Sequence, residues 1–343
     1  MCRRWAVRST RALAFACLVS CAGEIPPGEG AGSDGPSTIG HVERLDPRLD
    51  AIVPAGAVLE ILARGHAWTE GPVWVPALRS VLYSDVESNA IFRWSEGDSA
   101  AVWLQPSGYT GAVPRGGEMG SNGLVIDAEG RLVMAQHGDR RIARLDADLE
   151  APTPDFVTLS GSFEGRRYNS PNDLTLRSNG DVYFTDPPFG LEQRMDDPAR
   201  ELDFQGVFRL TADGTVTVVT DEMSGPNGIA FSPDEATLYV SNARRAQPVI
   251  MAYDVSEGGD VTNGRVFFES TGDGLAVDQQ GNVYVAGPGR GVLVIAPDGT
   301  HLGSIVTTER TSNCTFGDDG STLYITADMY LLRIRLTSTG VGF

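Results

Sequence analysis

Side chains that carry a carboxylate or amide oxygen recur along this 343-residue chain at intervals of roughly 40 to 55 residues. Each one introduces a short apolar stretch, as in Glu70-Gly-Pro-Val-Trp and Asp273-Gly-Leu-Ala-Val. Such oxygens are the ligands that hard divalent cations prefer, and calcium accepts six to eight of them in irregular geometry, unlike magnesium or zinc. The repeat therefore predicts a calcium site, with another divalent cation as the alternative, provided that the fold brings these six residues together: Glu70, Asn122, Asn172, Asn227, Asp273 and Asn313.

Asn-Gly and Asp-Gly are also common turn dipeptides, which is the simpler interpretation of each pair taken alone. Their repetition at one spacing, always before an apolar stretch, favours a ring of ligands instead. We call the six residues the ring residues below.

The elements that must position these residues are short strands separated by turns rich in Pro, Asp and Gly. In one repeat, Gly228-Ile-Ala-Phe is followed by the turn Ser232-Pro-Asp-Glu and then by Thr237-Leu-Tyr-Val. A period of this size with β patterning predicts an all-β, six-bladed β-propeller. Because equivalent positions of the blades face the same way, the ring residues should converge near one end of the central channel.

An additional strand precedes the first repeat, at residues 58–63, and has no blade of its own. The last repeat ends soon after Leu331-Leu-Arg-Ile-Arg-Leu. We therefore expect the N-terminal strand to complete the sixth blade and close the propeller, which removes exposed sheet edges.

The first residues have the layout of an export signal, because a basic segment precedes a short apolar one. The end of that segment, Leu18-Val19-Ser20-Cys21, resembles a bacterial lipobox, although an ordinary cleaved signal is the alternative. The prediction is a lipoprotein signal peptide at 1–20, lipid on Cys21, a flexible tether at 21–48 and the propeller at 49–343. The protein would be exported, as a periplasmic or outer-membrane lipoprotein, and would meet the membrane only through the lipid.

Composition excludes several classes of function. The net charge is −18, which argues against a nucleic-acid partner. The chain contains no lysine, which excludes a lysine Schiff base. It also contains no Gly-x-Ser-x-Gly motif, the usual mark of a covalent esterase.

Cys314 is the one cysteine of the expected propeller, so no intramolecular disulfide can form there. No protein partner is implied.

Several longer phrases resemble the family of senescence marker protein, gluconolactonase and luciferin-regenerating enzyme. The similarity covers residues 50–340 and rests on Glu70-Gly-Pro-Val-Trp, Asn169-Ser-Pro-Asn-Asp-Leu, Phe184-Thr-Asp-Pro-Pro-Phe-Gly, Pro226-Asn-Gly-Ile-Ala-Phe-Ser and Asp273-Gly-Leu-Ala-Val-Asp. Gln136-His-Gly-Asp-Arg and the Asn169 phrase point to its bacterial gluconolactonase branch. The resemblance implies a six-bladed propeller with calcium in the channel, held by Glu70, Asn172, Asn227 and Asp273.

The resemblance also implies a substrate, a sugar lactone similar to gluconolactone. In the animal branch an arginine lies two residues before the third-blade asparagine and holds the sugar acid, whereas this chain has Ser170 there. Ser170 and Asn172 are therefore expected to be substrate contacts. Asn122 and Asn313 would bind substrate hydroxyls rather than metal, with capping of a local turn as the alternative for each.

The expected reaction is hydrolysis of the lactone to the aldonic acid by metal-activated water, in which the cation polarises the carbonyl. Asp273 could orient or deprotonate the water, although a carboxylate on a dication is a poor base. His137 is the other candidate for carrying a proton, with a purely structural histidine as the alternative. Two other functions stay open, namely hydrolysis of another ester or a phosphotriester, and non-catalytic sugar binding with a structural calcium.

Overall fold

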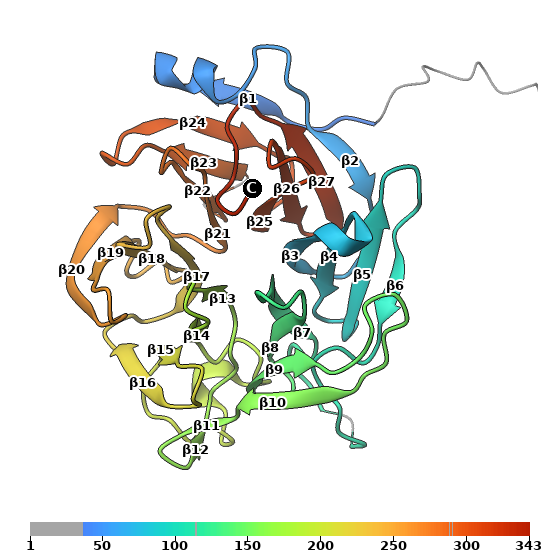
Figure 1. Ribbon diagram of the computed structural model, residues 1–343, viewed down its shortest axis with the longest axis vertical. Coiled ribbons are helices and arrows are strands. Elements are labelled where there is room, and N and C mark those ends of the chain that lie inside the picture. Colours follow the sequence, from blue (N-terminus) through green and yellow to red (C-terminus); the bar gives the residue numbers. More distant parts are fainter. Residues whose placement is uncertain (1–36, 114, 288, 290) are drawn as a thin grey trace, which may run out of the picture. The chain divides into compact units, whose positions relative to one another are not determined.

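The computed structural model describes residues 37–113, 115–287, 289 and 291–343. They form a six-bladed β-propeller, in which antiparallel sheets of four or five strands surround a central axis (Figure 1). The predicted fold class is therefore confirmed. The expected signal peptide and Cys21 lie outside the described residues, so export and lipidation stay predictions. No helix in the described ranges is long and apolar enough to cross a membrane.

Each blade is built from consecutive strands that run outward from the axis, with the N-terminal strands added to the last two blades. The strands are β3 (Thr69–Val75), β4 (Ser80–Asp85), β5 (Ala90–Ser95) and β6 (Ala101–Leu104) in blade one; β7 (Ser121–Ile126), β8 (Leu132–Gln136), β9 (Arg141–Leu145) and β10 (Phe156–Ser160) in blade two; β13 (Leu174–Leu176), β14 (Val182–Asp186), β15 (Gly206–Leu210) and β16 (Val216–Thr220) in blade three; β17 (Pro226–Phe231), β18 (Thr237–Asn242), β19 (Ile250–Val255) and β20 (Val261–Phe268) in blade four; β21 (Leu275–Val277), β22 (Val283–Ala286), β23 (Gly291–Ile295), β24 (His301–Val306) and β1 (His41–Arg44) in blade five; and β25 (Thr311–Gly317), β26 (Thr322–Ala327), β27 (Tyr330–Arg335) and β2 (Glu60–Ala63) in blade six. A small hairpin, β11 (Ser162–Phe163) with β12 (Arg166–Arg167), and three 3₁₀ helices, η1 (Pro47–Ala51), η2 (Pro76–Leu78) and η3 (Arg194–Asp196), lie in the connections.

The propeller closes through the N-terminal strand, as predicted. β2 pairs antiparallel with β27, and Arg333 of β27 forms ion pairs with Glu60 of β2 and with Glu96 in the turn after β5. At the start of blade one, the Thr69 hydroxyl donates to the backbone oxygens of Asp328 and Tyr330, at the turn between β26 and β27, both at 3.0 Å. The last blade is therefore joined to the first by backbone pairing and by side chains.

One difference from the sequence-based expectation concerns residues 41–51. The expected tether at 21–48 overlaps β1, which pairs with β24 as a fifth strand of blade five. Leu49 of the adjacent η1 helix is fully buried against the same sheet. The part of the tether from His41 onward therefore belongs to the propeller. Four residues are too few for an alternating pattern to stand out in the sequence.

The apolar core lies between the blades, because each pair of neighbouring sheets packs one cluster of buried side chains. Leu82 of blade one and Met134 of blade two share such a cluster, and Tyr83 and Tyr324 belong to another where blade six meets blade one. The tyrosines and phenylalanines stack within these clusters, which adds to the free energy gained from apolar burial.

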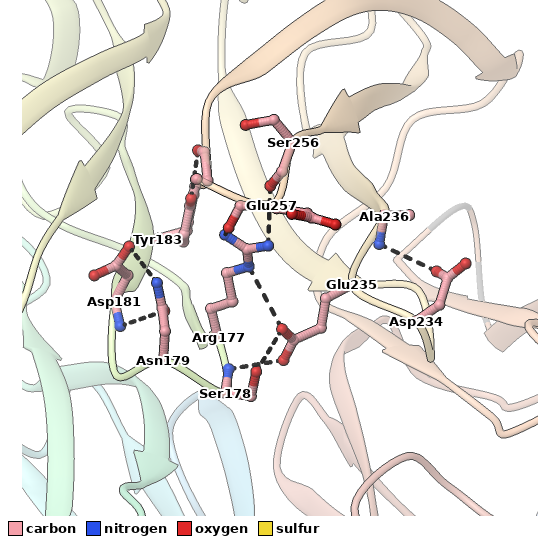
Figure 2. A network of polar contacts seen from close by, with 12 residues as sticks. Arg177, Ser178, Asn179, Asp181, Tyr183, Asp234, Glu235, Ala236, Ser256 and Glu257 are labelled. Carbon is pink, nitrogen blue, oxygen red and sulfur yellow. Dashed lines mark hydrogen bonds and ion pairs between the residues drawn. The ribbon is translucent and has the colours of Figure 1, made fainter.

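Polar contacts between turns join blades three and four. Figure 2 shows the network between blades three and four, in which Glu235 lies 3.4 Å from Arg177 Nε and accepts hydrogen bonds from the backbone and hydroxyl of Ser178 at 2.7 Å. The Arg177 guanidinium also donates to the backbone oxygens of Ser256 and Glu257. The turns that hold Arg177 and Glu235 follow the inner strands β13 and β17, whereas the ring residues precede or begin the inner strands, so these turns lie at the opposite end of the channel from the ring.

Candidate functional site

The ring residues lie where the pairing between the first two strands of a blade is irregular. The ladder shifts between Glu70 and Val73 in blade one and between Pro226 and Ile229 in blade four. In blade five the ladder begins only after Asp273, whose N–H donates to the Ala286 oxygen. Such bulges turn a side chain out of the plane of its sheet, and here they allow side chains to point toward the axis.

The glycines that follow the ring residues are required by close packing of the inner strands. A Cβ at Gly71 would lie 1.9 Å from the backbone oxygen of Asn122, and one at Gly228 would lie 2.1 Å from the backbone oxygen of Asp273. The Gly228 N–H donates to the same Asp273 oxygen at 3.0 Å. Gly is therefore present because the neighbouring backbone leaves no space for a side chain, and not because these pairs form isolated turns.

The first testable consequence concerns Gly228. We expect Gly228→Ala to lower the free energy of unfolding by about 2–3 kcal/mol, because the added methyl must push apart blades four and five. Gly56→Ala is the matched control, since a Cβ there meets no atom within 4 Å. Urea unfolding of both variants measures the effect. Equal stabilities would contradict the prediction, because they would show that the inner strands move apart to accept the methyl group with no loss of free energy.

Hydroxyl side chains of one blade hold the ring residue of the next. The hydroxyls of Ser84, Thr185 and Ser241 donate to the backbone oxygens of Asn122, Asn227 and Asp273 at 2.9, 2.8 and 2.5 Å. The donors lie at equivalent positions near the ends of β4, β14 and β18. The position of a ring residue is therefore fixed by its own blade and by the preceding one.

Five of the six ring residues line one pocket of about 370 Å³. Glu70, Asn122, Asn172 and Asn227 are each at most 5% exposed. Other lining residues come from connections that the repeat did not single out: Trp68, Glu87, Glu118, Phe189, Arg194, Ala243, Arg244 and Arg310. The volume falls within the range of pockets that bind small molecules.

Asn313 does not line this pocket. Its Oδ1 accepts the N–H of Cys314 at 2.8 Å, and its Nδ2 lies 3.4 Å from Asp173 Oδ2. Both Asn313 and Asp173 line a second cavity of about 430 Å³ further along the channel. The expected ring of six is therefore corrected to five residues, with Asn313 turned away from them.

Asp173 was not singled out by the sequence-based argument. It takes the place that glycine has after Glu70, Asn122, Asn227 and Asp273, and it is 7% exposed. Only Asn172 among the ring residues is followed by an acid, which is the signal that could have identified it.

Ser170 and His137 lie behind the pocket wall and do not line the pocket. The Ser170 hydroxyl donates to the Pro187 oxygen at 2.6 Å and accepts the Gly190 N–H at 2.9 Å. It therefore holds the loop 187–190, and Ser170 is not among the residues that line the pocket, so a direct contact with substrate stays a prediction. His137 is fully buried, and its Nε2 lies 3.3 Å from Asn172 Nδ2. Its Nδ1 lies 3.4 Å from the Glu118 carboxylate.

Asp186, at the end of β14, fixes the loop that leads to Asn172. Its carboxylate accepts the backbone N–H groups of Asn169 and Ser170, both at 2.7 Å. In blade one Asp85 accepts those of Ala67 and Trp68 in the same way. The loops before two of the inner strands therefore depend on a carboxylate at the end of the second strand.

We expect Asp186→Asn to destabilise the fold by about 1–3 kcal/mol, because the amide turns a donor toward one of two buried N–H groups. The loop containing Asn172 should also lose protection in hydrogen exchange. Asp234→Asn is the control, since that carboxylate caps an exposed turn between β17 and β18. Unchanged exchange at residues 169–172 in the Asp186 variant would contradict the positioning role.

The carboxyl groups in and below the pocket lie close enough to oppose one another's ionisation. Desolvation, then the charges of Asp273 and Asp173, raise the pKa of Glu70 well above its ordinary value. Desolvation and the charge of Asp173 raise the pKa of Asp273 to about 8, although Arg310 acts in the opposite direction. Desolvation raises the pKa of Asp173 to about 7. A group of acids enclosed in this way is stabilised by a positive charge among them.

The pocket residues fit a divalent cation. Three buried oxygens, Asn122 Oδ1, Asn172 Oδ1 and Asp273 Oδ1, have no hydrogen-bond partner in the structure. Buried oxygens without partners are rare unless a ligand satisfies them. Across the described ranges no three His, Cys, Asp or Glu side chains gather as a metal site, so a cation here needs amide oxygens as well. That mixture of carboxylate and amide suits calcium.

Comparison with known proteins agrees with this architecture. The family described as SMP-30/Gluconolactonase/LRE-like region matches residues 68–328. A gluconolactonase of Zymomonas mobilis is 38% identical over 319 residues, which cover 89% of this chain and 88% of that protein. A pentonolactonase of Haloferax volcanii is 30% identical over 75% of this chain and 80% of that protein.

Solved structures give the same result. That of a gluconolactonase from Xanthomonas campestris superposes with a TM-score of 0.77 at 34% identity, covering 90% of this chain and 98% of that one. From the family match and these relatives, the chain belongs to the SMP-30/gluconolactonase/LRE-like family.

Proposed function

We propose that this protein is a divalent-cation-dependent lactonase that hydrolyses a sugar lactone to the open acid, with calcium as the cation. The observation that carries the proposal is the set of unpartnered oxygens of Asn122, Asn172 and Asp273 in one pocket with Glu70 and Asn227. The relatives support the substrate class, because one is a gluconolactonase and another a pentonolactonase.

Glu70, Asn172, Asn227 and Asp273 would hold the cation, and Asn122 would contact either the cation or a substrate hydroxyl. A bound dication supplies Lewis-acid polarisation of the lactone carbonyl. Asp273 is the carboxylate best placed to orient the attacking water, because its Oδ1 has no other partner. Trp68 and Phe189 on the pocket wall offer apolar surface that excludes bulk water from the ring.

The test is hydrolysis of glucono-δ-lactone by the propeller domain, followed through proton release. Protein stripped by a chelator should not exceed the spontaneous rate, and calcium should restore turnover. Protein that binds calcium but hydrolyses neither hexonolactones nor pentonolactones would contradict the lactonase. Aryl esters and phosphotriesters assayed in parallel would then show whether another hydrolase activity replaces it.

His137 has two roles that one variant separates. As a proton carrier it would shape the dependence of the rate on pH. As a positioning residue it accepts a hydrogen bond from the Asn172 amide and so keeps Asn172 Oδ1 facing the pocket. We expect His137→Ala to weaken calcium binding by about 10–100-fold, with no change in the pH profile of the calcium-saturated enzyme. A profile that loses one limb would assign the proton-carrier role instead.

A further inference from the structure

The mouth of the pocket carries arginine side chains, although the protein as a whole is strongly acidic. Arg194, Arg244 and Arg310 all line it, and they come from three separate connections between strands. The net charge of the chain is −18, so a group of cations at one pocket is not explained by composition.

Aromatic rings of the pocket wall hold these arginines in place. The Arg244 guanidinium lies 5.8 Å from the centre of the Phe189 ring, and that of Arg310 lies 5.2 Å from the Trp68 ring. Arg194 also faces Phe189, at 6.0 Å. Cation–π contacts of this kind restrain a guanidinium and leave its N–H groups at the edge of the plane available to a ligand.

Only one of the three arginines forms an ion pair with an acid at the mouth, although the charge of Arg310 also favours ionisation of Asp273 deeper in the pocket. Glu118 lies 3.5 Å from Arg194 and also faces His137. Within the described residues, neither the Arg244 nor the Arg310 guanidinium forms an ion pair or a side-chain hydrogen bond, and Glu87 pairs with neither of them. Two arginines whose guanidinium N–H groups have no side-chain acceptor in the described part of the chain therefore line a pocket in which the ring residues would hold the cation and the lactone carbonyl.

We propose that the lactone carries an anionic group, a carboxylate or a phosphate, which Arg244 and Arg310 bind at the pocket mouth. This inference rests on the proposed lactonase and narrows its substrate class. Guanidinium groups match both anions through paired N–H donors. A neutral aldonolactone offers these arginines only hydroxyl and carbonyl oxygens as acceptors before the ring opens, whereas a lactone with a second acid group also offers a charge partner.

The experiment compares kcat/KM for three lactones on the calcium-loaded protein: neutral glucono-δ-lactone, 6-phosphogluconolactone and a glucarolactone that keeps a free carboxylate. We expect at least one anionic lactone to exceed the neutral one by tenfold or more. The two anionic substrates distinguish phosphate from carboxylate. The preference should weaken as salt rises, because the mouth is open to solvent.

Arg244→Gln and Arg310→Gln should each reduce the ratio of anionic to neutral kcat/KM by at least fivefold. Arg245→Gln is the matched control, because Arg245 follows directly in the same connection, carries the same charge and does not line the pocket. Its ratio should equal that of the parent protein. Thermal unfolding of each variant, with calcium, verifies that it is folded.

An equal or higher kcat/KM for the neutral lactone would overturn the proposal. Variants that lower kcat/KM equally for all three lactones would also overturn it. The latter result would mean that the arginines act on the carboxylate formed in the reaction. If no lactone is hydrolysed, the proposed function itself fails. Titration of the protein with inorganic phosphate would then test the anion site by itself. Binding that Arg244→Gln and Arg310→Gln weaken would support the site, and no binding would overturn it.

Discussion

Replacing Asp273 with Asn is expected to reduce calcium-dependent lactone hydrolysis by about 10²–10³-fold, while the metal-free protein becomes more stable at pH 8. The two effects have opposite signs for one reason. In the metal-free protein, desolvation and the neighbouring acid Asp173 oppose ionisation of Asp273, so a neutral amide of the same shape relieves the repulsion. With calcium present, the same carboxylate is the charge that the cation requires.

The measurement is thermal unfolding of parent and variant, each with chelator and with saturating calcium, next to the rate assay. The parent should gain stability from calcium according to its affinity, and Asp273→Asn should gain little. Asp254→Asn is the control, because that carboxylate pairs with Arg265 at the blade surface. A variant that keeps the full calcium-induced gain would remove Asp273 from the ligand set.

The second large effect is a loss of stability of the metal-free protein as pH rises from about 4 to about 8. Asp173 titrates at about 7 and Asp273 at about 8, both above the ordinary pKa of an aspartate near 4. A group whose pKa is raised in the folded state contributes stability at low pH, and that contribution is lost as pH rises through the folded pKa. The loss from Asp273 accumulates between its ordinary pKa near 4 and its raised pKa of about 8, at about 1.4 kcal/mol per pH unit, so about half of it falls above pH 6.

Urea unfolding at pH 6, 7, 8 and 9, on protein stripped of metal by dialysis, measures this loss. Calcium should reduce the dependence of the free energy of unfolding on pH, because the cation stabilises the ionised Asp273 and Glu70. The difference between the two curves should therefore grow with pH. Parallel curves would show that calcium binds away from these acids, and a metal-free protein equally stable at pH 6 and pH 9 would contradict the raised pKa values.

The sequence predicts the parts of the site that repeat with the blades. Glu70, Asn122, Asn172, Asn227 and Asp273 were identifiable because each blade places its inner strand in the same way, so spacing along the chain becomes proximity in space. Asn313 has the same spacing but a different environment. Its amide forms hydrogen bonds with Asp173 and with the N–H of Cys314. The spacing of residues along the chain does not predict which partners a side chain will bond.

The other pocket residues were missed because the connections between strands that carry them follow no period. Phe189, Arg244 and Arg310 belong to connections of different lengths, and only the folded chain brings them to one mouth. Ser170 was expected to contact substrate because of its place in the phrase, yet its hydroxyl is used by the loop 187–190. Position in a motif predicted where these residues lie better than it predicted what they contact.

The tight packing at the axis also bears on how such a site could change over evolutionary time. The glycines after Glu70, Asn122 and Asn227 are dictated by the neighbouring backbone, and selection for folding alone would retain them. The residue just before each glycine projects into the pocket and carries Glu, Asn or Asp on equivalent backbone. A ligand can thus be replaced at one blade without disturbing the inner strands, so a new metal preference or substrate can arise by point substitution on an unaltered scaffold.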